Sequence, residues 1–288
     1  MGPRERACRG VRRGEAPRET MNGARCVAIA VFRESVRDRV FYNLVFFAVL
    51  LIAASILIGQ LTAGQDVKII KDLGLSATSL FGLFIAIFVG ISLVSKEVDR
   101  RSVYPLFAKP IRRSEFIAGK YAGLLLTLLA NTIVMTIAIY AVLFFLSRGV
   151  PPDVQAAWDA PALDPALLEA IALIYVEIAL VTAIALFFST YSSPMLSAVF
   201  TLGIYIAGQF NTDLKRFDQI VSSPIAAAIG KGCYYVLPDF ARFDVKLAVV
   251  HGIPVSGGYV AAAAGYAALY IAALLFGAVV LFNRRDFK

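Results

Sequence analysis

Two long uncharged apolar runs constrain the fold of this chain more than any other feature. The runs cover about residues 78–94 and 122–145. A lipid hydrocarbon core about 30 Å thick needs about 20 mostly apolar residues per helical span, and both runs come near that length or exceed it. They therefore predict two membrane-spanning helices, joined by a charged segment that lies outside the bilayer.

The composition favours several spans rather than two. Hydrophobic residues make up 59% of the chain, against about 45–50% in typical soluble domains, and the mean hydropathy is +0.74. The net charge of +8 could suit nucleic acid, but the basic residues flank apolar runs instead of covering a soluble face. We therefore expect a lipid bilayer and a cytosolic protein as partners, and no nucleic acid.

The first 20 residues carry six arginines among glycine and proline and lack the apolar region of a secretory signal. We expect residues 1–20 to be a disordered basic extension and residues 21–288 to form a single membrane domain. Met21 precedes the first ordered-looking segment, so the chain has two candidate starts.

The apolar pattern predicts an all-α polytopic fold with six transmembrane helices. The fifth would be short, because 16 residues at 1.5 Å each cover about 24 Å. The connection 211–258 is apolar and predicts external helices resting on the membrane face; a seventh span there would bury Lys231, at a cost of about 2.5–3.5 kcal/mol. The six predicted spans cover about residues 41–61, 76–94, 119–146, 167–188, 195–210 and 259–282.

The distribution of lysine and arginine predicts the orientation. Positive charge gathers before the first span, between the second and third spans, and after the last span, whereas the first-to-second and third-to-fourth connections are balanced or acidic. Because cytoplasmic flanks retain positive charge, both termini are expected in the cytoplasm.

The segment before the first span predicts an amphipathic helix, because apolar residues recur there at three- and four-residue steps while charges occupy the other angles. Two roles remain open: an interfacial anchor, or an elbow helix that lies along the cytoplasmic surface and also touches a partner. The apolar residues are Ile29, Phe32, Val36 and Val40. The candidate elbow-helix residues are Phe32, Arg33 and Arg37.

One carboxylate, Glu177, falls inside a predicted span. A charge at that depth is costly, so Glu177 is expected to face the bundle interior or a wet cavity. It is either a structural polar contact or a residue of a translocation path. Plausible hydrogen-bond partners are Asn131, Thr132 and Thr182.

No catalytic constellation is evident in the sequence. His251 is the single histidine, and the phosphate-binding pattern G-x-x-x-x-G-K-[ST] is absent. An intramembrane enzyme would need clustered acidic, histidine or serine groups, and Glu177 stands alone. We therefore expect no enzyme activity, metal site or bound cofactor in this chain, and any ATP dependence would come from another polypeptide.

The charged segment carries a family resemblance. Residues 94–104, VSKEVDRRSVY, and 108–120, AKPIRRSEFIAGK, resemble the cytoplasmic loop of type 2 ABC-transporter permeases. The similarity is greatest to the branch that includes the permease of copper-enzyme (nitrous oxide reductase) maturation, and it extends through the amphipathic start, the six-span layout and residues 235–244. It covers nearly everything from Met21 onward.

The resemblance implies the permease subunit of an ATP-driven exporter in the plasma (inner) membrane. Two permease chains would pair, as a homodimer or heterodimer, and each would dock on a cytosolic ATPase subunit that binds ATP and Mg. The coupling helix would lie within residues 97–109, where Pro105 departs from the family pattern. The residues assigned to this ATPase-coupling loop are Glu97, Arg100, Arg101, Tyr104, Lys109, Pro110, Arg112, Arg113, Gly119 and Lys120.

Two alternatives remain beside that reading. The loop arginines could serve only positive-inside retention and lipid contact. The whole chain could instead be a non-transporting membrane assembly factor or scaffold that holds a partner against the bilayer.

Overall fold

The computed structural model describes residues 16–37, 39–60, 66–99, 113–155, 158, 161–211 and 237–284. Every element in these ranges is an α-helix or a 3-10 helix, which confirms the predicted all-α class. The elements are α1 (Ala16–Val36), α2 (Arg39–Gln60), α3 (Asp66–Asp99), α5 (Arg113–Gly149), α6 (Pro152–Gln155), α7 (Ala166–Ser189), α8 (Pro194–Gln209), η1 (Phe240–Phe243), α12 (Lys246–Val250) and α13 (Gly257–Arg284).

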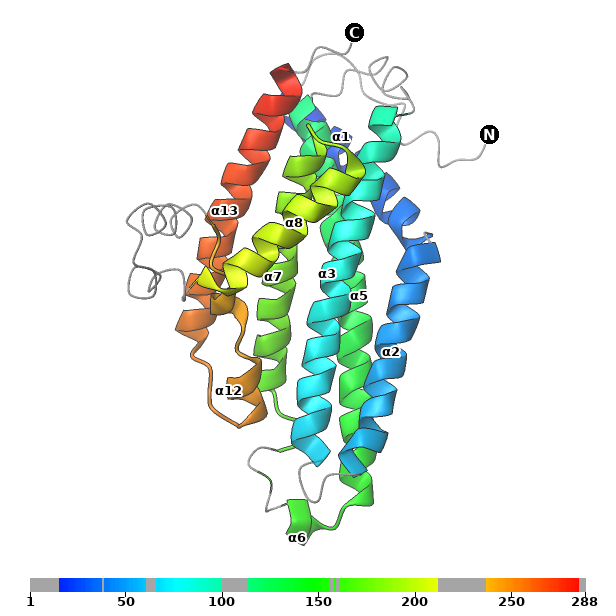
Figure 1. The fold of residues 1–288 in the computed structure, drawn as a ribbon, viewed down its shortest axis with the longest axis vertical. Helices are drawn as coiled ribbons and strands as arrows, with labels where there is room; N and C mark the ends of the chain where they lie inside the picture. The colour runs from blue at the N-terminus through cyan, green and yellow to red at the C-terminus, as the bar shows by residue number, and fades with distance from the viewer. Residues whose placement is uncertain are drawn as a thin grey trace, which may run out of the picture.

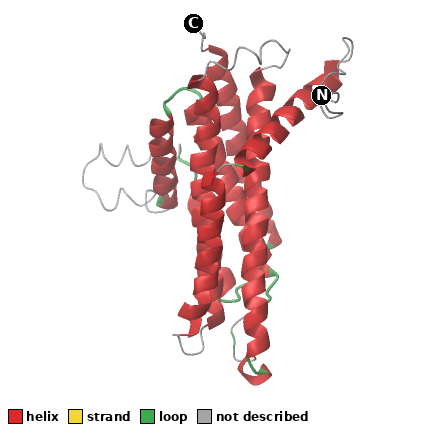
Figure 2. Cartoon of the chain, turned by 90° about the vertical axis from the view of Figure 1, so that its right-hand side faces the viewer, coloured by secondary structure: helices red, strands yellow, loops and turns green. Residues whose placement is uncertain are grey.

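Three long helices, α3, α5 and α7, form the centre of the bundle. Helix α2 packs on α3, α13 packs on α7, and α1 packs on α5. Helix α1 runs obliquely to the long helices at one end of the bundle (Figures 1 and 2). We call this the α1 end; it also holds the last turns of α3 and α13 and the first turn of α5. The opposite end holds α6 and is called the α6 end (Figure 1).

Among the described residues, four helices are long and apolar enough to cross a membrane, which confirms four of the six predicted spans by length and composition. Helices α2 and α8 carry shorter apolar stretches, Leu44–Leu57 and Pro194–Gln209, so the first and fifth spans stay predictions. The four confirmed spans are Val67–Ile91, Ser114–Gly149, Ala166–Ser189 and Gly257–Phe282.

Helix α3 begins ten residues before the predicted span at residue 76. The sequence placed Lys71 and Asp72 in an external loop, but both lie within α3. The helix continues through these charges because Val67, Ile70 and Leu75 are buried on its inner face and Lys71 finds polar partners. At 34 residues, α3 is about 51 Å long and exceeds the hydrocarbon thickness.

Helix α8 starts where the sequence suggested, because Ser193 is extended and Pro194 occupies the first turn. A proline fits there, since its missing N–H would lack an intrahelical partner anyway. The helix runs from the α1 end to part of the way along the bundle (Figure 1). The short elements η1 and α12 then pack against α7, and α12 also packs against α3. Both short elements belong to the connection 211–258, which was predicted to form external helices, and residues 212–236 of it lie outside the described residues.

The buried hydroxyls inside the bundle bond mostly to their own helices. Thr132 donates to the Leu128 carbonyl at 2.9 Å, and Thr182 donates to the Ile178 carbonyl at 2.8 Å. Such bonds, four residues back along a helix, satisfy a hydroxyl without a neighbouring helix. Asn131 differs, because neither amide atom has a hydrogen-bond partner within the described part of the chain. The three predicted partners of Glu177 are therefore not its partners in this structure.

Candidate functional site

The two helices that flank the predicted coupling loop both reach the α1 end. Glu97 lies in the last turn of α3, and Arg113 begins α5. The middle of the predicted loop lies outside the described residues, including most of the predicted coupling helix. The assigned residues in that part are Arg100, Arg101, Tyr104, Lys109, Pro110 and Arg112.

Gly119, assigned to the return of the loop into the third span, lies on α5 where α1 crosses it. A Cβ atom at Gly119 would lie 2.7 Å from the Ala24 carbonyl oxygen and 2.8 Å from Val27 Cβ. Any side chain here would collide with main-chain atoms of α1, which cannot rotate away. Glycine at this position therefore permits the close approach of the two helices.

Gly123 repeats this contact one turn further along α5. Its Cβ would lie 2.6 Å from the Ala28 carbonyl oxygen and 2.7 Å from Val31 Cβ. Glycines four residues apart let helix backbones approach closely inside membranes. Gly119 and Gly123 thus form a glycine seat, on which α1 rests through the face that carries Ala28 and Val31.

The face of α1 that meets the seat is a different face from the predicted apolar stripe, whose contact with the membrane surface stays a prediction. Ala28, Val31 and Ser35 are buried, whereas Ile29 is 50% exposed. The glycine seat selects small and β-branched side chains of α1 that allow close contact. Among the predicted elbow residues, Phe32 is half-buried, and Arg33 and Arg37 are exposed.

Lys120 lies beside the glycine seat and is 3% exposed. Its Nζ lies 4.6 Å from the centroid of the Phe116 ring, and Phe116 stacks on Phe282 of α13 with a centroid distance of 6.2 Å. A cation over a ring face is attracted by the ring quadrupole. The first turns of α5 therefore contact both α1 and α13.

Glu177 is buried at 3% exposure in the interior of the bundle, as its sequence context predicted. Its Oε1 accepts hydrogen bonds from Tyr205 Oη at 3.1 Å and from Gln209 Nε2 at 2.9 Å. Both donors lie on α8, one turn apart. Asp244 and Lys246 of the segment around α12 lie within electrostatic range of the carboxyl group.

Sequence reasoning missed Tyr205 and Gln209, although their pattern was visible. They continue a row of polar residues at four-residue steps along α8, after Ser197 and Thr201, and residues at that spacing share a helix face. The arrangement joins α7 to α8 through a buried acid. Chemically, it can hold a charge or a polar group inside the bundle.

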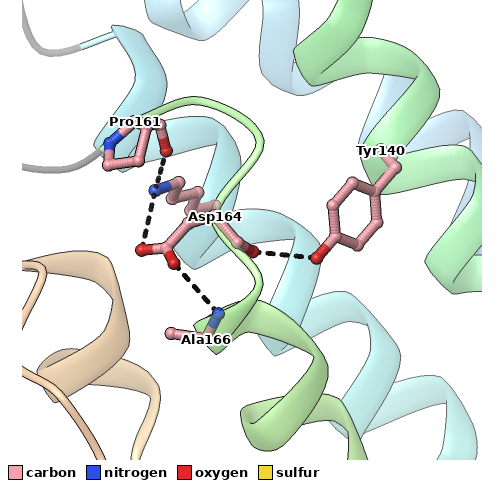
Figure 3. Close-up of polar contacts among 5 residues, drawn as sticks. Tyr140, Pro161, Asp164 and Ala166 are labelled. Atoms are coloured by element: carbon pink, nitrogen blue, oxygen red, sulfur yellow. Dashed lines mark hydrogen bonds and ion pairs between the residues drawn. The ribbon is translucent and has the colours of Figure 1, made fainter.

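A second polar cluster, also unforeseen, lies at the α6 end (Figure 3). Lys71 is fully buried; its Nζ donates to the Pro161 carbonyl at 2.8 Å and lies 4.0 Å from Asp164 Oδ2. Asp164 Oδ1 accepts the Ala166 N–H at 2.9 Å, and its main-chain carbonyl accepts a hydrogen bond from Tyr140 Oη at 2.9 Å. We call these residues the lysine clasp, which ties α3, α5 and the start of α7 together.

Comparison with known proteins identifies the family. The sequence model of the family described as ABC-2 family transporter protein matches residues 26–287, nearly the whole chain. No curated protein matches the chain. The described part of the chain holds four helices long and apolar enough to cross a membrane. The chain therefore belongs to the ABC-2 transporter family and is a multi-pass membrane permease component of an ABC transporter, which works with an ABC ATPase subunit.

Proposed function

We propose that this chain is the permease half of an exporter of the plasma (inner) membrane, driven by a cytosolic ATPase that docks on the loop between α3 and α5. In this proposal α2, α3, α5, α7, α8 and α13 are the six spans, and both termini face the cytoplasm. Two permease chains pair to complete the transporter. The loop resemblance also supports membership of the copper-enzyme maturation branch.

The observation that carries the proposal is the glycine seat. Helix α1 rests on α5 through Gly119 and Gly123, within the first three turns after the predicted coupling loop. An ATPase that contacts the loop would therefore also move α1, the proposed elbow helix. Arg33 and Arg37 are exposed on α1, where they are free to meet the partner or lipid headgroups.

In the proposed mechanism, the ATPase performs the bond chemistry and this chain transmits force. Nucleotide-driven closure of two ATPase subunits displaces the loops, and the rigid spans turn that displacement into a change of access between the two permease halves. In this proposal Glu177 is a residue of the translocation path. Its burial further along the bundle and its hydrogen bonds with α8 support that role.

The test is charge reversal in the loop, Arg100→Glu with Arg101→Glu, followed by affinity purification of the solubilised chain from its own membrane. We expect the wild-type chain to bring down a stoichiometric ATPase, and the variant to insert normally but to lose ATPase association. A wild-type eluate without ATPase activity would contradict the proposal and favour the membrane scaffold.

The matched control is Arg284→Glu with Arg285→Glu. It makes the same change of charge on the same predicted side of the membrane, but outside the loop. If positive-inside retention were the only role of the loop arginines, both double variants would behave alike. We expect the tail variant to retain its ATPase.

A further inference from the structure

Helices α5 and α7 exchange two hydrogen bonds of the same kind. Tyr121 Oη of α5 donates to the Ala179 carbonyl of α7 at 3.2 Å. Tyr175 Oη of α7 donates to the Leu125 carbonyl of α5, also at 3.2 Å. On α5, Tyr121 lies four residues before the acceptor Leu125. On α7, Tyr175 lies four residues before the acceptor Ala179. We call Tyr121 and Tyr175 the tyrosine pair.

Both acceptors are main-chain oxygens in the interior of a helix. Such a carbonyl accepts the N–H four residues later and still has a second lone pair for a hydroxyl donor. Unlike a side-chain acceptor, it cannot change rotamer, so the bond fixes the tyrosine to the helix axis itself. Two bonds four residues apart, about 6 Å along the axis, fix the axial register of α5 against α7.

The surroundings make these bonds hard to replace. Tyr121 is 8% exposed and Tyr175 is half-buried. Both lie on helices confirmed as spans. A tyrosine hydroxyl that loses its carbonyl at that depth finds little water to take its place. Sliding α5 along α7 would therefore break both bonds together.

The position of the tyrosine pair links the glycine seat to Glu177. On α5, Tyr121 lies between Gly119 and Gly123, so one turn of helix holds both the glycine seat and the first bond. On α7, Tyr175 and Ala179 flank Glu177, so one turn holds the second bond and the buried carboxylate. The link between the sites is thus a single pair of helices.

We propose that Tyr121 and Tyr175 are positioning residues, which make α5 and α7 move as one body during the transport cycle. A displacement delivered to the start of α5 then reaches Glu177 without being lost in slippage between the helices. This inference rests on the proposed function, because it assumes that an ATPase acts at the α1 end.

The test measures one distance in the intact complex. The three cysteines are replaced by serine, and spin labels are placed at Ser114→Cys at the start of α5 and at Leu168→Cys in the first turn of α7. Both side chains are exposed. Pulsed electron paramagnetic resonance records the distance between the labels, without nucleotide and after trapping with ATP and vanadate. The complex is purified with its own ATPase, and its hydrolysis rate is recorded.

We expect the wild-type chain to show one narrow distance that is the same in both states. In the double variant Tyr121→Phe with Tyr175→Phe, we expect ATP hydrolysis to persist. The trapped state should then broaden or shift by about one helical turn, about 5 Å. A wild-type distance that changes on trapping, or a double variant that gives wild-type distances in both states, would overturn the inference.

Tyr140→Phe provides the matched control. Tyr140 also lies on α5 and also donates to a main-chain carbonyl, that of Asp164, but this acceptor precedes α7 and lies at the α6 end. We expect the Tyr140→Phe distances to match those of the wild type. Broadening in this variant as large as in the double variant would show that the tyrosine pair has no special role.

The two proposals fail in different ways. Lack of ATPase activity in the wild-type complex contradicts the proposed function before any distance is measured. With the ATPase present and active, the distances test the tyrosine pair alone.

Discussion

The two ends of this bundle are held together by opposite kinds of contact. At the α1 end, α1 lies on bare glycine backbone at Gly119 and Gly123, and the contact depends on shape. At the α6 end, the lysine clasp joins three helices through a buried cation, two carbonyl oxygens and a carboxylate. Shape complementarity tolerates small rotations of helices, whereas a buried cation requires fixed partners.

The difference matches the proposed roles of the two ends. Force from the ATPase would enter at the α1 end, where close but apolar packing carries a push without directional bonds to break. The α6 end lies farthest from that input, and the clasp holds it as a fixed point. With α5 and α7 moving as one body, a push at the α1 end would tilt the pair about the fixed α6 end, and Glu177 on α7 would move with it.

The largest effect is expected from Lys71→Met. Methionine keeps most of the volume but removes the cation, and it leaves the Pro161 carbonyl and Asp164 without their shared partner. Breaking a buried charged contact costs about 3 kcal/mol, measured as the loss of unfolding free energy in detergent. The control is Lys68→Met, one turn earlier and only half-buried; equal losses in the two variants would mean that the clasp does not hold the α6 end.

Gly123→Leu is expected to cost about 2 kcal/mol, because overpacking forces the backbones of α1 and α5 apart. We also expect α1 to become accessible to added protease while the α6 end is unaffected. Gly265→Leu is the control, since nothing lies within 4 Å of a Cβ at Gly265. If the Gly123 variant were as stable and as protease-resistant as the Gly265 variant, the glycine seat would not be what holds α1 on α5.

The smallest effect is expected from Tyr140→Phe, about 0.6 kcal/mol, typical of one interhelical hydrogen bond in a membrane protein. Lys71 still holds Pro161 in this variant, so the clasp should remain closed. Combining Tyr140→Phe with Lys71→Met gives a double-mutant cycle on the unfolding free energy. Strictly additive losses would show that the tyrosine and the lysine act separately, and that the clasp is not one unit.

The fold was largely predictable because apolar length alone identifies most spans. The predicted spans 119–146, 167–188 and 259–282 fall inside α5, α7 and α13. The start of α3 was missed because Lys71 and Asp72 end an apolar run in the sequence, although the helix buries the lysine against partners about 90 residues away. Partners so distant in sequence leave no local signal.

The candidate site was predictable only in part. The depth of Glu177 followed from its apolar context, but its partners depend on how α8 crosses α7, which residue spacing within one helix does not report. The face of α1 that packs on α5 was not predicted, because two glycines on α5 determine which side of α1 can come close.

The docking of α1 on α5 has a consequence for how the chain is made. Helix α1 is synthesised well before α5, yet it packs mainly on α5 and only slightly on its neighbour α2. At about 5–20 residues per second, the roughly 95 residues between Ala28 and Gly123 take about 5–20 s to synthesise. Throughout that interval α1 has no seat on α5, so the membrane surface or a chaperone must shelter it, and a helix made before α5 can settle only after α5 is made.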